Sequence, residues 1–194
     1  AVSATGHYNI VKQLLDKNAN VNAQGGFYSN ALQAVLGIGH NRIVKRLLDK
    51  DADGAAVNAK GGEYGTALQA ASRKNYYRLL LDKGADVNTK GGFYASALQA
   101  ASRGYGQTTV KLLLKRGADV NTQGGKYSNA LQAVSERGNN EIVTLLLGKS
   151  ADVNAQGGKY SNAFLAASVN SYYSTFVLLQ AALEKARQDP YTAK

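Results

Sequence analysis

A motif of two glycines, one variable residue and a tyrosine recurs along the chain at a nearly constant spacing. Its copies begin at Gly25, Gly61, Gly91, Gly124 and Gly157. The period is about 33 residues, although residues 53–56 lengthen the first interval and residues 72–84 are a shortened form of the corresponding segment in the next copy. A fixed period in this range indicates a solenoid, in which each unit buries its apolar face only by stacking on its neighbours.

The residues between two copies of the motif predict two helices. After the fourth copy, residues 129–137 predict a short first helix, because Asn129 can cap the first turn and no glycine or proline interrupts it. Residues 141–149 predict a second helix, because their aliphatic side chains form a broad apolar face. The equivalent capping residues of the other first helices are Asn30, Thr66, Ser96 and Asn162.

Glycine and short polar residues predict where each second helix ends and a hairpin begins. Gly84, Gly117 and Asn18 can adopt the left-handed conformation that closes a helix, whereas Asp51 and Ser150 suit this position less well. The pattern Ala-Asp-Val-Asn follows several of these ends and leads into the glycine pair. This pattern predicts an extended stretch and then a projecting hairpin, so the unit is helix, turn, helix, hairpin.

Three further rows of residues recur with the same period. We expect the aspartates to form Asx turns and the asparagines to bond the backbone of the neighbouring repeat. We expect the tyrosines to pack each hairpin against its helix, although a tyrosine ring can also present a binding face. The rows are Asp86, Asp119 and Asp152; Asn22, Asn58, Asn88, Asn121 and Asn154; and Tyr28, Tyr64, Tyr94, Tyr127 and Tyr160.

Several segments of this pattern resemble the ankyrin repeat. They are GADVNT from Gly117, IVTLLL from Ile142, and the Ala-Leu-Gln-Ala segments that stand where the family has Thr-Pro-Leu-His-x-Ala. The resemblance covers nearly the whole chain and implies an all-α ankyrin-repeat solenoid of stacked helix-turn-helix units with projecting β-hairpin loops. Ala in place of Pro, Gln in place of His, and the Gly-Gly-x-Tyr hairpin are similar to fungal ankyrin arrays. Those arrays often form the sensor part of larger receptors, so the resemblance also implies a fragment of a larger fungal protein.

The resemblance implies a single ankyrin-repeat domain over residues 1–194. A partial first repeat covers residues 1–24, because the chain enters the pattern inside a repeat. Further repeats cover about residues 25–60, 61–90, 91–123 and 124–156. We expect residues 157–194 to form a C-terminal capping repeat, because the polar segment QAALEKARQD replaces the usual ending and Pro190 follows it.

The composition bounds the classes of partner and of chemistry. Lys and Arg number 23 against 13 acidic residues, a formal charge of +10, which favours nucleic acid, an anionic membrane or an acidic protein as a partner. The chain has no Cys, and its two His, His7 and His40, have no neighbour at metal-ligand spacing. No common catalytic or phosphate-binding motif is present. We therefore expect a protein that is not an enzyme and that needs no metal or cofactor.

The sequence favours a soluble chain. No apolar run approaches the roughly 20 residues that span a bilayer, and the segment AVSATGHYN lacks the features of a signal peptide. The lack of Cys leaves both secreted and intracellular compartments open, with the cytoplasm favoured. The oligomeric state is left open.

The candidate partner-binding residues are those that vary while the repeat frame stays the same. They occupy the hairpin tips, the positions before the glycine pair, and the ends of the first helices, on the concave side that ankyrin arrays generally use. They are Phe27, Glu63, Phe93, Lys126 and Lys159 at the tips; Lys60 and Lys90 before the glycines; and Arg73, Lys74, Arg103 and Arg137 at the helix ends. We expect this surface to bind a protein partner with an acidic surface.

Three other interpretations stay open. The array can be an architectural spacer in a multidomain receptor, or, less favoured, a nucleic-acid-binding module with stacking at Phe27 or Phe93. The cations can also form an ordinary solvated surface, because the second helices carry Lys12, Arg42, Lys45, Arg46 and Lys111 as well.

Overall fold

The structure is a computed structural model that describes residues 7–50, 55–71, 76–104 and 106–188. These residues form helices joined by loops, and the extended residues among them make only isolated bridges at the hairpins. The all-α fold class is therefore confirmed. The chain divides into two compact units, Ala1–Ala97 and Leu98–Lys194, which are described one after the other.

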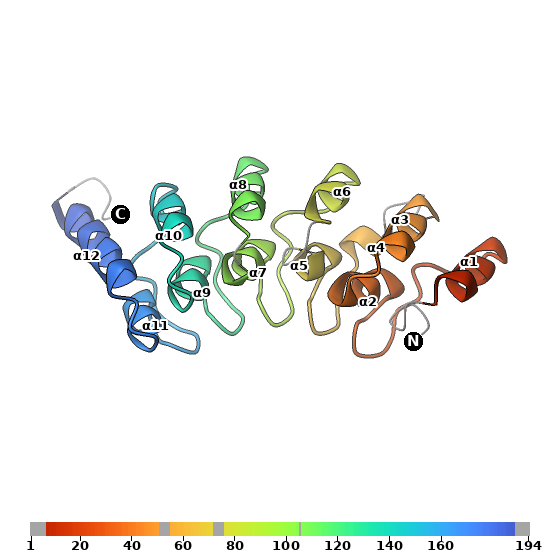
Figure 1. Ribbon diagram of the computed structural model, residues 1–194, viewed down its shortest axis with the longest axis horizontal. Coiled ribbons are helices and arrows are strands. Elements are labelled where there is room, and N and C mark those ends of the chain that lie inside the picture. Colours follow the sequence, from red (N-terminus) through yellow and green to blue (C-terminus); the bar gives the residue numbers. More distant parts are fainter. Residues whose placement is uncertain (1–6, 51–54, 72–75, 105, 189–194) are drawn as a thin grey trace. The chain divides into compact units, whose positions relative to one another are not determined.

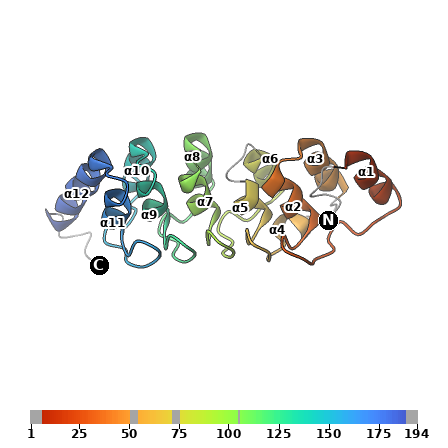
Figure 2. The same cartoon turned by 60° about the horizontal axis from the view of Figure 1, so that its bottom comes forward.

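The first unit contains the second helix of the partial first repeat and the two repeats that follow it. Within this unit α2 packs beside α5, and α1 packs beside α3, so that first helices contact first helices and second helices contact second helices (Figures 1 and 2). Part of the insertion forms the short helix α4, and the shortened repeat has a shorter second helix, α6. The bounds are α1 (Tyr8–Asp16), α2 (Ala31–Ile38), α3 (Asn41–Lys50), α4 (Ala55–Asn58), α5 (Ala67–Ala71) and α6 (Tyr77–Asp82).

The second unit repeats the arrangement of helix pairs. The first helix α9 packs against α11, and the second helix α10 lies between α8 and α12. The helix α12 is the longest of the described helices and supplies the polar C-terminal helix expected from the sequence. The bounds are α7 (Ala97–Arg103), of which all but the first residue belong to this unit, α8 (Gln107–Lys115), α9 (Ala130–Ser135), α10 (Asn140–Leu147), α11 (Ala163–Ser168) and α12 (Tyr173–Gln188).

The helix ends agree with the expected caps. The side chains of Asn30, Asn129 and Asn162 each accept a bond from the backbone N–H three residues on, and the Thr66 hydroxyl does the same for Gln69. At the ends of the second helices, Gly84, Gly117 and Asn18 are left-handed, with φ of 82°, 84° and 57°. Ser150 is left-handed too, with φ of 62°, although the sequence favoured it less. Asp51 lies outside the described residues.

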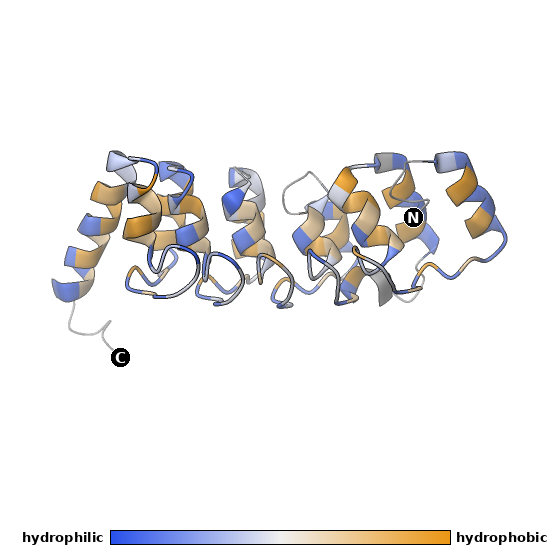
Figure 3. Cartoon of the chain, turned by 90° about the horizontal axis from the view of Figure 1, so that it is seen from below, coloured by the Kyte–Doolittle hydropathy of each residue, from blue (hydrophilic) through white to orange (hydrophobic). Residues whose placement is uncertain are grey.

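The core of each unit is built from small side chains on first helices and branched aliphatic side chains on second helices. Alanines such as Ala70 and Ala100 are fully buried and let adjacent first helices approach closely. Leu113, Ile142 and Leu146 on the second helices are also fully buried. In both units the apolar residues gather on the helices, whereas the loops are mostly hydrophilic (Figure 3). This division explains why one repeat cannot fold without a neighbour.

A buried glutamine in the first helix links each repeat to the next. Its side-chain amide nitrogen donates to backbone carbonyls of the following loop, which would otherwise be buried without a donor. All four glutamines of this kind are buried. The bonds run from Gln33 to Ala59 O at 3.0 Å; from Gln69 to Thr89 O and Ala95 O, both at 3.1 Å; from Gln99 to Thr122 O at 3.0 Å and Ser128 O at 3.2 Å; and from Gln132 to Ala155 O at 3.4 Å and Ser161 O at 3.5 Å.

Asparagine side chains make a second link at the loop before the hairpin. Asn58 donates to Gly84 O at 3.0 Å and accepts from the N–H of Asp86 at 2.8 Å. Asn121 makes the same pair of bonds to Ser150 O and to the N–H of Asp152. The expected asparagine ladder is thus confirmed at both positions. The aspartates form the expected Asx turns, since the carboxylates of Asp86, Asp119 and Asp152 accept the N–H two residues on.

The hairpins stack directly on one another through their backbones. The N–H of Glu63 donates to Phe27 O at 3.0 Å, and the N–H of Phe93 donates to Glu63 O at 2.8 Å. The approach is close at the second glycine of the motif: a Cβ added at Gly92 would lie 2.3 Å from the backbone nitrogen of Gly65. This position also has a positive φ of 62°. Both the backbone conformation and the neighbouring loop therefore require glycine there.

The last repeat lacks this polar link. Leu165 stands where the other first helices have the buried glutamine, and it is 50% exposed because no hairpin follows it among the described residues. Val169, at the end of α11, and Tyr173, at the start of α12, are 64% and 78% exposed. A capping repeat needs a polar outer face. These exposed apolar side chains do not fit that requirement, whereas the charged last turn of α12 does, so the assignment of residues 157–194 as a cap stays a prediction.

We expect Gln99→Leu to destabilise the protein by about 1 to 3 kcal/mol, because the carbonyls of Thr122 and Ser128 lose their buried donor. Urea unfolding followed by circular dichroism measures the change. Leu165→Gln is the matched control at the same helix position without a following hairpin, and it should change stability by less than about 0.5 kcal/mol. Equal effects of the two substitutions would contradict the role of the glutamine.

We expect Gly92→Ala to be more damaging than Gly84→Ala. Both residues have a positive φ, so each substitution costs about 1 kcal/mol of backbone strain. A Cβ at Gly84 meets no atom within 4 Å, whereas one at Gly92 overlaps the preceding hairpin. Gly92→Ala should therefore cost about 1 to 3 kcal/mol more, measured by the same unfolding experiment. Similar costs for both would show that the hairpins are not tightly stacked.

Candidate binding surface

The hairpin tips place one variable side chain per repeat on a backbone frame that does not vary. Each tip loop closes by a bond from the N–H of the first glycine to the carbonyl four residues on, at 2.9 Å in the loop of Gly61 and 3.0 Å in the loop of Gly91. In the second unit the N–H of Lys159 donates to Lys126 O at 2.8 Å, which stacks those two tips as in the first unit. We call the tips, the residues before the glycine pairs and the ends of the first helices the hairpin face.

Two aromatic tips in the first unit are exposed. Phe27 is 64% exposed and Phe93 is 40% exposed. Each ring makes an edge contact with the tyrosine that follows it, with ring centroids 5.0 Å apart for Phe27 and Tyr28 and 4.8 Å apart for Phe93 and Tyr94. Each ring is therefore supported by the tyrosine that follows it, while part of its surface remains exposed.

The tyrosines of the motif pack as expected. Tyr94, Tyr127 and Tyr160 are buried. Tyr28 stacks on Tyr64 with a centroid distance of 6.0 Å, and Tyr127 stacks on Tyr160 at 6.5 Å. These rings tie each hairpin to its neighbour and are not available as a binding face, which confirms the packing interpretation for the buried rings.

The lysines of the hairpin face are exposed. Lys60, Lys90 and Lys126 all lie at the surface. The Lys126 ammonium lies 5.6 Å from the centroid of the Tyr127 ring, close enough for a cation–π contact.

Arg103 and Lys159 lie within hydrogen-bonding distance of the buried carboxylate of Glu136. The Nε of Arg103 lies 2.6 Å from Oε2 of Glu136 and 2.9 Å from the hydroxyl of Tyr127. The Tyr160 hydroxyl donates to Oε1 of Glu136 at 2.5 Å, and the Lys159 ammonium lies 3.5 Å from the same oxygen. We call these five side chains the Glu136 network; it joins three successive repeats of the second unit.

The electrostatics of the network favour the ionised carboxylate. Burial alone would raise the pKa of Glu136, but the bond from Tyr160 and the charges of Arg103 and Lys159 outweigh it and lower this pKa. The hydrogen bond to Tyr160 raises the pKa of Lys159, and burial raises the pKa of Tyr160. At neutral pH the network therefore contains a glutamate anion with two cations.

The remaining candidate residues lie in different environments. Arg137 is partly exposed, and its Nε donates to the carbonyl of Arg103 at 3.4 Å. Glu63 is exposed at its tip. Arg73 and Lys74 lie outside the described residues. The candidates thus comprise exposed side chains, which are Phe27, Phe93, Glu63, Lys60, Lys90, Lys126 and Lys159, and partly exposed ones, which are Arg103 and Arg137. Of these, Arg103, Arg137 and Lys159 make polar bonds within the array.

Sequence reasoning missed Glu136. The signal was available in the alignment of the repeats, because Glu136 occupies the register of Arg73 and Arg103. An acidic residue one repeat after a basic one at the same register predicts a cross-repeat ion pair, in the same way that opposite charges one turn apart pair on a helix. Comparing the charges at aligned positions of the repeats, in addition to the residues that the repeats share, identifies Glu136 as the partner of Arg103.

Among the residues that the structure describes, no group of three or more His, Asp or Glu side chains is placed to hold a metal ion. In the same part of the chain no helix is both long and apolar enough to cross a membrane.

The fold and the repeating frame agree with comparison to known families. A family model described as ankyrin repeats, in three copies, matches residues 1–91 and again residues 97–189. The chain therefore belongs to the ankyrin-repeat family. Members of this family generally mediate protein–protein interactions and are typically non-catalytic. The comparison with curated proteins finds no match.

We expect Glu136→Gln to lower the stability of the protein by about 1 to 3 kcal/mol near pH 7, because Arg103 loses its charged acceptor. The contribution of Glu136 is present above the ordinary pKa of a carboxyl group, which is 4.5, and is lost as the pH falls through the lowered value. Urea unfolding of both chains between pH 7 and pH 3 tests this sign. The difference between them should shrink below about pH 4. Glu141→Gln, an exposed carboxylate on α10, is the control and should have little effect at any pH.

Proposed function

We propose that the chain is a non-catalytic scaffold that binds a protein partner with an acidic surface through its hairpin face. The observation that carries the proposal is the set of exposed tip and pre-glycine side chains on a stacked backbone. The frame repeats, while Phe27, Glu63 and Phe93 differ in charge and size from one tip to the next. Such a row presents a specific chemical pattern without requiring the loops to rearrange.

The exposed rings and the exposed lysines would have separate roles in binding. Phe27 and Phe93 supply apolar area with little conformational freedom to lose, which is typical of the residues that dominate binding energy. Lys90 lies before the glycines of the Phe93 loop, and Lys60 lies before those of the Glu63 loop, which stacks between the two aromatic tips. The two lysines would attract acidic residues of a partner. The first unit therefore offers two aromatic anchors with lysines beside them, which suits a partner that has acidic residues around an apolar patch.

We also propose that the array serves a larger fungal protein as its sensor part. The support is the resemblance of the Gly-Gly-x-Tyr hairpin and the Ala-Leu-Gln-Ala helix to fungal ankyrin arrays. The binding role does not depend on this source.

We expect Lys60→Glu with Lys90→Glu to slow association with the partner by about tenfold or more at low salt, because reversed charges remove the steering. The matched control is Lys111→Glu with Lys115→Glu on α8, which changes the net charge equally at two exposed positions of a second helix. Affinity capture with the unaltered chain and both variants, followed by mass spectrometry, identifies the partner, and surface plasmon resonance then measures the association rate.

A third variant, Phe27→Ser with Phe93→Ser, tests the aromatic anchor and should raise the dissociation rate of the same partner. A protein that the hairpin variants lose and the α8 variant retains supports the proposal. Capture that disappears after nuclease treatment would instead indicate a nucleic-acid-binding module, and the absence of any specific capture would indicate an architectural spacer.

A further inference from the structure

The second-helix side of the first unit carries a cluster of cations that the hairpin face does not explain. In α3, Ile43, Val44 and Leu47 are buried in the core, together with Leu48. Four of the other residues of this helix are basic: Arg42, Lys45, Arg46 and Lys50. These basic residues lie on α3, whereas the tips project beside the first helices of the unit (Figure 1).

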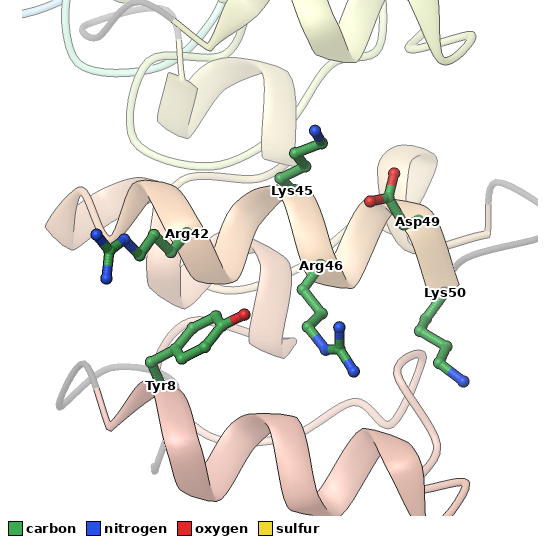
Figure 4. Close-up of a pocket in the computed structure, with 6 residues that line it drawn as sticks. All are labelled: Tyr8, Arg42, Lys45, Arg46, Asp49 and Lys50. Atoms are coloured by element: carbon green, nitrogen blue, oxygen red, sulfur yellow. The ribbon is translucent and has the colours of Figure 1, made fainter.

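Three of the cations share one edge of α3. Arg42, Arg46 and Lys50 follow one another at intervals of four residues, which places them on the same side of a helix. With Tyr8 of α1 and with Lys45 and Asp49 of α3 they line a depression of about 280 Å³ between the two helices. Figure 4 shows Tyr8, Arg46 and Lys50 reaching toward the space between α1 and α3, whereas Lys45 and Asp49 point away from α1. We call this depression the α1–α3 groove.

The protein neutralises this row only in part. Arg46 Nη2 pairs with Asp16 of α1 at 2.6 Å. Among the described residues the Nε of Arg46 has no acceptor, although it is shielded from water, and neither Arg42 nor Lys50 has a carboxylate partner. A shielded donor without an acceptor is costly, and like charges four residues apart repel. An anion in the groove would offset the repulsion along this row.

The groove contains more hydrogen-bond donors than one carboxylate group can accept. Two guanidinium groups present planar forks of N–H donors, Lys50 adds an ammonium, and Tyr8 adds a hydroxyl. A carboxylate has two oxygens, whereas a phosphate monoester has three terminal oxygens and nearly two negative charges at neutral pH. Arginine forks bind such a group through paired hydrogen bonds. The small size of the groove suits one phosphate group more than an extended chain of phosphates.

We propose that the α1–α3 groove is a binding site for a phosphate monoester, held by Arg42, Arg46, Lys50 and Tyr8. The site lies on second helices and uses none of the hairpin-face residues, so a partner bound at the tips leaves it accessible. A phosphorylated side chain of a protein and a soluble phosphate ester present the same group to it. The array would then bind a phosphorylated ligand separately from the unmodified partner surface.

The test uses the full chain labelled with ¹⁵N and follows backbone amide shifts by NMR. The probes are N-acetyl-phosphoserine amide, the same compound without phosphate, sodium acetate, inositol trisphosphate and a single-stranded oligonucleotide. We expect phosphoserine amide to shift amides of α1 and α3 in a saturable way, with no such shift from the unphosphorylated compound or from acetate at equal concentration. Stronger binding of inositol trisphosphate would assign the group to a soluble ester, and stronger binding of phosphoserine amide would assign it to a modified protein.

Matched variants connect the shifts to the groove. Arg42→Gln with Lys50→Gln should weaken phosphoserine binding by about tenfold or more, and Tyr8→Phe should weaken it severalfold. Lys111→Gln with Lys115→Gln removes the same charge from α8 and should leave binding unchanged. Circular dichroism melts confirm that each variant is folded.

Several results would overturn the proposal. One is an equal loss of phosphoserine affinity in the groove variant and in the α8 variant. Another is that acetate shifts the amides as much as phosphoserine amide does, and a third is that no amide of α1 or α3 shifts in a saturable way. Tighter binding of the oligonucleotide than of either monoester, at equal phosphate concentration, would replace the groove by a nucleic-acid surface. None of these outcomes depends on the hairpin face, so the test is independent of the proposed function.

Discussion

The buried glutamine that donates to the next loop is the interaction on which the rest of the array depends. A hairpin placed against a first helix brings backbone carbonyls out of water, and a buried carbonyl must find a donor. Gln69 and Gln99 each supply one amide nitrogen to two such carbonyls. Because one bond partner sits before the glycine pair and the other sits after it, the side chain holds both strands of the hairpin at once. The positions of the loops that follow Gln33, Gln69, Gln99 and Gln132 are thereby set by the helix of the preceding repeat.

The close approach of the hairpins follows from this placement. Once the glutamines fix the positions of the loops, the backbones of neighbouring tips come into contact. Position 92 then has room only for glycine, because the backbone of Gly65 lies directly against it. The side chain between the glycines and the tyrosine is not needed for these backbone bonds, although Lys159 at this position also joins the Glu136 network. It can be a phenylalanine at Phe27, a glutamate at Glu63 or a lysine at Lys126 without a change in the frame. This separation of frame and tip makes the hairpin face suitable for specific binding.

The basic side chains of this protein lie in three different environments, and the environment determines what each of them can do. Arg103 and Lys159 contribute to the Glu136 network and stabilise contacts between repeats. Lys60, Lys90 and Lys126 stay exposed, and Arg42 and Lys50 face a groove of their own. Residues of one charge thus have three different environments in one chain. A net charge of +10 describes none of these environments by itself.

The sequence by itself determined the repeat length, the helix pairs, the caps and the hairpin, because each of these depends on local backbone preferences that a few residues express. Asn129 as a cap and Gly84 as a helix end were predictable for this reason. The asparagine ladder was also predictable, since its residues recur in a fixed register. Only the tertiary structure decided that Tyr160 donates to Glu136, that the glutamines carry the contacts between repeats, and that the α3 cations line a groove with Tyr8. The glutamine bonds join residues that are 20 to 29 positions apart, and Glu136 and Tyr160 are 24 positions apart, so their distances depend on how closely the repeats stack. Stacking distance is a property of packed neighbours, so no single repeat contains it.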